Sequence, residues 1–155
     1  MLEKLCAAGP VAGIARVGHA PFEQDDPLEI TFESGTVFHL EVGFEAASDI
    51  VVGEGPLLEA AYGHLRAQDP DSFSAIARGW TRQALELAWL TGMRLCNPRR
   101  LTMTHPYRLD VGYVFDAGTR QLALFGESDL IFAAALDDPH IASFALETGA
   151  PYSAA

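Results

Sequence analysis

The chain has 155 residues, a formal net charge of −11 and a hydrophobic fraction of 49%. This length and apolar content are enough to bury one core, which excludes a disordered polypeptide and predicts a single domain over residues 1–155. The negative charge disfavours binding to nucleic acids and anionic membranes, and no apolar run approaches the roughly 20 residues that span a bilayer.

Residues 11–54 have the pattern of a four-stranded meander. Apolar or alternating segments predict strands over 13–17, 28–32, 36–42 and 50–52. If the sheet has one core side, the apolar residues of the two hairpin strands share a face, which places Phe32 opposite Phe38. This register requires a three-residue turn, Ser34-Gly35-Thr36, with Gly35 at a positive φ.

Helical spacing follows over residues 56–91. Pro56 and the pair Asp69-Pro70 predict the starts of two helices, and Gly92 predicts the end of the second. The longer helix should pack on the sheet through an apolar face that includes Phe73, Ile76, Trp80 and Leu87.

The second half of the chain repeats the pattern of the first. Strands are predicted over 93–96, 109–115, 120–125 and 130–134, the turn at 114–119 resembles that at 31–36, and the segment 128–131 resembles 48–51. The sequence therefore predicts an α+β fold. It consists of a mostly antiparallel sheet from two related four-strand halves, about 11–54 and 92–135, with a helical pair at about 56–91 inserted between them and packed on the sheet.

The two predicted hairpins differ in the polarity of their second face. Leu122 and Leu124 make the later hairpin apolar on both faces, so we expect its strands to lie at the centre, under the helices. The earlier hairpin carries Glu29, Thr31, His39 and Glu41 on its alternate face, which we expect to be exposed to water.

Several residues are candidates for chemistry, and each lacks a required companion. His39-Leu40-Glu41 matches the opening of a zinc deaminase signature, but no Pro-Cys-x-x-Cys follows. Gly53-Glu54-Gly55 precedes a helix without the third glycine or the basic residue of a phosphate loop. Cys96 and His105 are candidates for a nucleophile and its base, but only their proximity in sequence links them, and a buried, inert thiol is the common case for a cysteine in an apolar strand. We therefore expect no enzyme activity, no catalytic residue, no metal and no cofactor.

Cysteines and arginines add two further expectations. No export signal is visible at the N-terminus, which favours a cytoplasmic location with Cys6 and Cys96 reduced. A basic cluster, Arg94, Arg99, Arg100 and Arg108, is interpreted as either a solvated loop or a contact for an anion or partner.

Acidic residues are concentrated in the first part of the chain. Residues 1–60 contain eleven acids and two bases, a balance of −9, whereas the other 95 residues balance to −2. The expected hairpin register places Glu29 opposite Glu41, which costs roughly a few tenths of a kcal/mol because like charges face each other. Two interpretations stay open: a solubility device, or a docking face for a basic protein. The candidate partner-binding residues are Asp25, Asp26, Glu29, Glu33, Glu41 and Asp49.

The order of four strands, a helical pair and four strands resembles small α+β immunity proteins found beside bacterial toxin effectors. The resemblance covers most of residues 11–135 and rests on the hairpin segment at 31–42 and on the final Ser128-Asp129-Leu130-Ile131-Phe132. It implies a non-enzymatic protein that binds and blocks a cognate toxin, and it supplies no catalytic residue.

Two other function classes are compatible with the sequence. One is a small-molecule-binding domain or enzyme with a pocket between sheet and helices, near Trp80, Trp89 and Tyr113, although the spacing of these residues is also typical of a core. The other is a subunit of a larger assembly. The sequence does not predict an oligomeric state.

Overall fold

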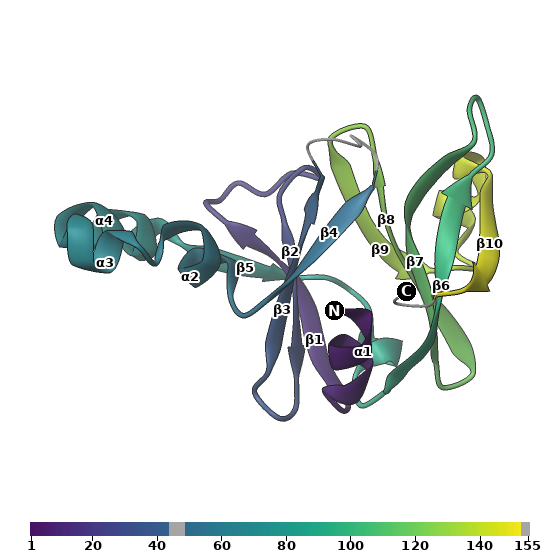
Figure 1. Ribbon diagram of the computed structural model, residues 1–155, viewed down its shortest axis with the longest axis horizontal. Coiled ribbons are helices and arrows are strands. Elements are labelled where there is room, and N and C mark those ends of the chain that lie inside the picture. Colours follow the sequence, from purple (N-terminus) through teal and green to yellow (C-terminus); the bar gives the residue numbers. More distant parts are fainter. Residues whose placement is uncertain (44–48, 153–155) are drawn as a thin grey trace.

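Two five-stranded antiparallel sheets face each other in the computed structural model, which describes residues 1–43 and 49–152 (Figure 1). Sheet 1, in spatial order, contains β4 (Ile50–Glu54), β3 (Val37–Val42), β2 (Leu28–Phe32), β1 (Val11–Gly18) and β5 (Thr81–Ala84). Sheet 2 contains β10 (Leu146–Pro151), β6 (Leu95–Met103), β7 (Leu109–Ala117), β8 (Arg120–Glu127) and β9 (Leu130–Ala135). The α+β fold with two related halves is confirmed.

Short helices occupy the connections. They are α1 (Leu2–Ala7), α2 (Leu57–Tyr62), α3 (Leu65–Gln68), α4 (Pro70–Gly79), and the 3₁₀ helices η1 (Ala88–Leu90) and η2 (Pro139–Phe144). In the described part of the chain, none of the helices has the length and apolar character needed to cross a membrane.

Both sheets are built by the same chain path. In each half a four-strand meander ends at one edge of the sheet, a helical crossover follows, and a fifth strand pairs antiparallel with the first strand. The halves are therefore larger than predicted, because each includes a crossover and a fifth strand, β5 or β10. The matched turns differ in length: Glu33-Ser34-Gly35 lies between Phe32 and Thr36, which are hydrogen-bonded to each other just before β3 begins, whereas only Gly118-Thr119 separates β7 from β8.

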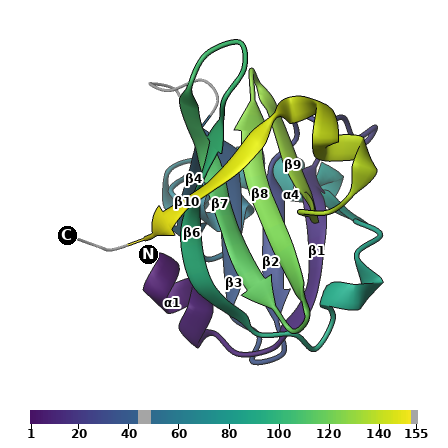
Figure 2. The same cartoon turned by 90° about the vertical axis from the view of Figure 1, so that its right-hand side faces the viewer.

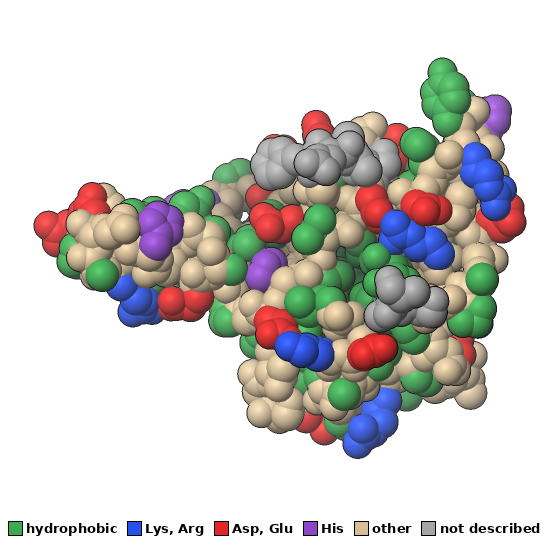
Figure 3. Space-filling model, viewed as in Figure 1, with side chains coloured by type: hydrophobic (Ala, Val, Ile, Leu, Met, Phe, Trp, Pro, Cys, Tyr) green, Lys and Arg blue, Asp and Glu red, His purple; other side chains and the backbone are tan. Residues whose placement is uncertain are grey.

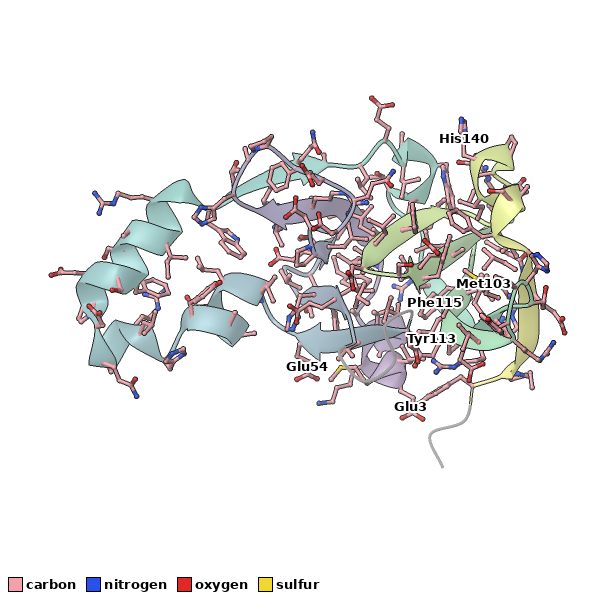
Figure 4. The ribbon with its side chains drawn as sticks, turned by 90° about the horizontal axis from the view of Figure 1, so that it is seen from above. Glu3, Glu54, Met103, Tyr113, Phe115 and His140 are labelled. Carbon is pink, nitrogen blue, oxygen red and sulfur yellow. The ribbon has the colours of Figure 1, made fainter. Side chains whose placement is uncertain are left out.

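The main core lies between the sheets. In the view from above, Phe115 points into this space (Figure 4). The fully buried residues of this main core come from both sheets and include Leu28, Ile30, Phe32, Leu40, Phe115, Leu122 and Leu124. Burial of this apolar surface on two facing sheets is the main stabilising contribution to such a sandwich.

The η2 segment and β10 cross the other face of sheet 2 (Figure 2). There Val114, Ala123 and Phe125 form a second core with Ile141 of η2. The prediction that this sheet is buried on both faces is therefore confirmed in outline. Sheet 1 covers one face and η2 covers the other. The expectation that the helices of residues 56–91 cover this sheet is wrong, since the sequence pattern did not reveal η2.

Helices α2, α3 and α4 form an arm that packs on sheet 1 at its base and projects beyond it (Figure 1). At the base, Trp80 makes edge-to-face contacts with His19 and Tyr62. Phe73 is buried within the arm, beneath the guanidinium of Arg66, and belongs to neither of the two core clusters of the sheets. The helical prediction extended too far, since α4 ends at Gly79 and Thr81–Ala84 pairs with β1 as a strand.

The β2–β3 hairpin keeps the predicted faces but not the predicted register. Ile30 lies opposite Phe38, so the strands are shifted by two residues from the expected pairing of Phe32 with Phe38. The turn has three residues and Gly35 has a φ of +88°, both as predicted. Glu29 lies opposite His39 and not opposite Glu41, so the expected opposition of two carboxylates is wrong.

Candidate functional site

Loops from both halves meet at one end of the sandwich, at the top of Figure 1. This end contains the β1–β2 connection (19–27), the facing ends of β3 and β4, and the β8–β9 turn (128–129). A backbone hydrogen bond of 2.9 Å from Ile131 N–H to the Gln24 carbonyl ties the first connection to β9. Residues distant in sequence thus become neighbours at the loop end.

Arg16 holds this junction together from inside. Its buried guanidinium donates to the backbone carbonyls of Gln24 (3.3 Å), Asp26 (2.8 Å) and Ile131 (2.8 Å). Burial lowers the pKa of Arg16 below its ordinary value, and the nearby carboxylates of Asp26 and Asp25 oppose that shift. The charge of Arg16 is therefore used within the fold.

Acidic side chains from both halves surround the junction. Figure 3 shows acidic side chains along this upper part of the molecule. We define the acidic loop end as Glu23, Asp25, Asp26, Glu41, Glu127 and Asp129; Asp26 and Glu127 are half-buried and the others are exposed. Two of these six, Glu127 and Asp129, come from the second half, whose nearly balanced charge gives no sign of an acidic surface.

Asp49 is part of an ion pair between the sheets. Its Oδ2 lies 2.5 Å from Nη2 of Arg100 on β6, and the same guanidinium lies over the ring of Tyr113 and 3.4 Å from Asp110. Burial lowers the pKa of Arg100, but Tyr113, Asp49 and Asp110 outweigh it, so the pKa is raised overall. Asp49 therefore has a structural partner already.

Glu29 is also committed to the fold, because its side chain is only 3% exposed. Oε2 accepts a hydrogen bond from Leu57 N–H at the start of α2 (2.7 Å), and Oε1 accepts one from Arg82 of β5 (2.9 Å). One carboxylate thus fastens both ends of the arm to sheet 1.

The neighbouring His39 is buried as well. Its Nδ1 lies 2.9 Å from the Gly55 carbonyl, and its ring covers Gly53, where a Cβ would overlap it. The expectation that this sheet face is exposed is therefore wrong at Glu29 and His39, because the base of the arm covers them. Glu41 on the same face is exposed.

The six predicted partner-binding residues thus separate into three groups. Asp25, Asp26 and Glu41 lie at the acidic loop end, Glu29 and Asp49 hold the fold together, and Glu33 is exposed in the β2–β3 turn at the opposite end. No family model, curated protein or solved structure matches this chain. The acidic loop end is therefore assigned on geometry and charge alone.

The other candidates for chemistry are not brought together. Cys96 is the second residue of β6 and donates to the Asp116 carbonyl (3.6 Å), whereas His105 lies beyond the far end of the same extended strand. Over residues 1–43 and 49–152, no group of three or more His, Cys, Asp or Glu side chains is placed to hold a metal ion.

The aromatic residues of the alternative pocket also lie apart. Trp80 contacts the arm and His19, whereas Trp89 lies beneath Arg120 and Tyr113 beneath Arg100. A groove of about 610 Å³ lies elsewhere, between α1 and the ends of β3 and β4. It is lined mainly by small apolar side chains and backbone, with the ion pair of Lys4 and Glu54 at its border.

Arginines of the predicted basic cluster are largely neutralised. Arg99 pairs with Asp116, Arg100 with Asp49, and Arg108 with Glu147. These contacts favour a structural role for the three guanidinium groups over an anion-binding one.

Asp116 gives this cluster a testable dependence on pH. Its carboxylate accepts hydrogen bonds from Asn97 (2.9 Å), Gln121 (3.3 Å) and Arg99 (2.5 Å). The bond from Asn97 contributes most to lowering the pKa of Asp116 below its ordinary value of 3.8, while burial opposes it. Because the folded-state pKa is lowered, this stabilisation is complete above about pH 4 and is lost as the pH falls through the folded-state pKa.

We expect Asn97→Gly to raise the pKa of Asp116 toward 3.8. Glycine accepts the positive φ of residue 97 (+50°), so the change removes the amide donor without straining the backbone. Titration of the Asp116 carboxyl carbon by NMR measures the effect. An equal pKa in wild type and variant would show that Asn97 does not set it.

Proposed function

We propose that the chain is a non-enzymatic binding protein that docks a basic protein through the acidic loop end. The main support is the gathering of acids from both halves around a junction whose central base, Arg16, is already hydrogen-bonded to backbone carbonyls. Arg100, the base linking the sheets near Asp49, is likewise paired. The exposed acids Glu23, Asp25, Glu41 and Asp129 form no ion pair with either of these two bases, so they present negative charge at the loop end.

The partner is proposed to be a toxin domain that is neutralised by stoichiometric docking. This part rests on the resemblance to small immunity proteins, while the acidic loop end supplies a mechanism. Complementary charge accelerates the encounter of two proteins, and bound protein then blocks the toxin without any covalent chemistry.

A second candidate is a small-molecule-binding domain, favoured by the groove of about 610 Å³ beside α1. Its volume falls within the usual range of ligand sites, roughly 300 to 1,000 Å³. The groove lies away from the acidic loop end, so variants of one site leave the other intact.

The test uses the purified product of the adjacent gene and a charge-matched pair of triple variants. Asp25→Asn, Glu41→Gln and Asp129→Asn remove three exposed acids from the loop end, whereas Glu3→Gln, Glu33→Gln and Glu86→Gln remove three exposed acids elsewhere. At low salt, we expect the loop-end variant to associate about tenfold more slowly and the control variant to change much less, because steering depends on local charge.

Dissociation should change little in either variant, and added salt should remove most of the difference. Equal association rates for the two triple variants would contradict the acidic loop end. A gene product that neither inhibits growth of a bacterial host nor binds this chain would contradict the toxin assignment.

A further inference from the structure

The β6–β7 hairpin carries the most exposed large apolar side chain among the described residues. Tyr107 is 73% exposed and Leu109 is 44% exposed. Both belong to the tip that rises beyond the sandwich at its loop end (Figures 1 and 2). Tyrosine is among the residue types that are enriched at protein interfaces and that contribute most to their binding energy.

The two halves of the chain differ in how they pack the connection between their first two strands. The β1–β2 connection occupies the same place in sheet 1 that the β6–β7 connection occupies in sheet 2. The first is folded against β9 through Arg16 and the Ile131 N–H to Gln24 bond, whereas the second projects with Tyr107 uncovered. The β1–β2 connection is thus packed against the neighbouring sheet, whereas the tip of the β6–β7 connection is not.

The projecting tip is held from one side by Ala145, at the end of η2, and by β10. Thr104 donates to the Ala145 carbonyl through its N–H (3.0 Å) and its hydroxyl (2.9 Å). Arg108 pairs with Glu147 at 3.3 Å. A supported tip loses less conformational entropy on binding than a disordered loop does, and this favours its use as a binding contact.

The charge near the tip fits the same partner as the acidic loop end. Arg108 is neutralised by Glu147, so it does not repel a basic protein. The β8–β9 turn, which is flanked by Glu127 and contains Asp129, lies at the same end of the molecule (Figure 2). A basic protein held by these acids would therefore meet Tyr107 as the foremost apolar group.

We propose that Tyr107 is an anchor that enters an apolar pocket, bordered by basic residues, on the protein docked at the acidic loop end. Leu109 adds apolar contact area beside it. The inference rests on the proposed function for the nature of the partner, and it assigns to the tip a distinct kinetic role. The acids set the rate of association, and Tyr107 sets the rate of dissociation.

The experiment places a photo-crosslinking benzoylphenylalanine at position 107 of the full chain, in the native cells. Position 41 reports the acidic loop end, and position 36, exposed directly after the β2–β3 turn at the opposite end, is the control. We expect one adduct with a basic polypeptide at positions 107 and 41, and much less at position 36. The crosslinked protein is then identified, purified and used as the probe for kinetics.

With that probe, Tyr107→Ala should dissociate about thirtyfold faster, as is usual for an aromatic anchor, while Tyr107→Phe stays near wild type. Circular dichroism confirms that both variants are folded. If Tyr107→Ala dissociates at the wild-type rate, or if the crosslinked adduct at position 107 is no stronger than that at position 36, Tyr107 is not an anchor.

The two proposals fail separately. If removal of the loop-end acids leaves association unchanged while Tyr107→Ala still accelerates dissociation, the anchor stands and the acidic docking mechanism is wrong. If the acids slow association when removed but Tyr107→Ala has no effect, the docking mechanism stands and the anchor is wrong. Absence of adducts at both 107 and 41 overturns both.

Discussion

Gly112→Ala is expected to lower the free energy of unfolding by about 3 kcal/mol, because overpacking a closely packed site forces the backbone to move. Gly112 lies in β7 between Leu101 of β6 and Phe125 of β8. A Cβ here would overlap the Leu124 carbonyl oxygen and lie 2.7 Å from the Phe125 Cα. Main-chain atoms of a central strand cannot turn aside as a flexible side chain can.

Gly13→Ala is the matched control. Gly13 also lies in a strand of a five-stranded sheet, but no heavy atom lies within 4 Å of the position its Cβ would take. We expect a change within about 0.5 kcal/mol, since alanine also reduces the entropy of the unfolded chain. Urea unfolding measures both variants, and equal midpoints would refute the close approach of β7 and β8 at Gly112.

Glu29→Gln is expected to lower the free energy of unfolding by about 2 kcal/mol, the range for losing charge-assisted hydrogen bonds of a buried group. The amide keeps the size of the side chain, but it cannot accept from both Leu57 N–H and Arg82 as the carboxylate does. Hydrogen exchange should become faster in α2 and β5, since Glu29 joins both to sheet 1.

Glu41→Gln provides the comparison, because Glu41 lies on the same sheet face and is exposed. Surface substitutions of this kind usually stay within about 0.5 kcal/mol. If the two variants unfold at the same urea concentration with the same exchange pattern, Glu29 does not fasten the arm.

The hairpin shows what local sequence could predict and where it stopped. Alternation assigned the faces of β2 and β3 correctly, and glycine identified the positive φ of the turn. The position of the turn was predicted one residue too late. Gly35 is the last residue of the turn Glu33-Ser34-Gly35, whereas the prediction placed it in the middle of Ser34-Gly35-Thr36. The two-residue shift removed the argument that Glu29 and Glu41 repel each other.

Long-range pairing accounts for the other differences. Residues 81–84 continue a helical spacing, yet they form a strand because the edge of β1 offers backbone partners. Strand β10, with Gly149 and Pro151, has little strand character of its own and depends on pairing with β6. The acidic loop end could be predicted only in part, since Glu127 and Asp129 join it through contacts between the halves.

The shared chain path of the two sheets also bears on how the crossovers can vary. Each crossover closes a loop between the meander and its fifth strand, and the entropy cost of closing a loop rises by only about 0.6 kcal/mol for each doubling of its length. The arm at residues 55–80 and the shorter crossover at 136–145 therefore place similar demands on their sheets. Added residues therefore cost little stability in these two segments. In contrast, the two-residue turn at Gly118-Thr119 cannot be lengthened without disturbing the register of β7 and β8. Insertions that add new surface to this scaffold are accommodated at the crossovers.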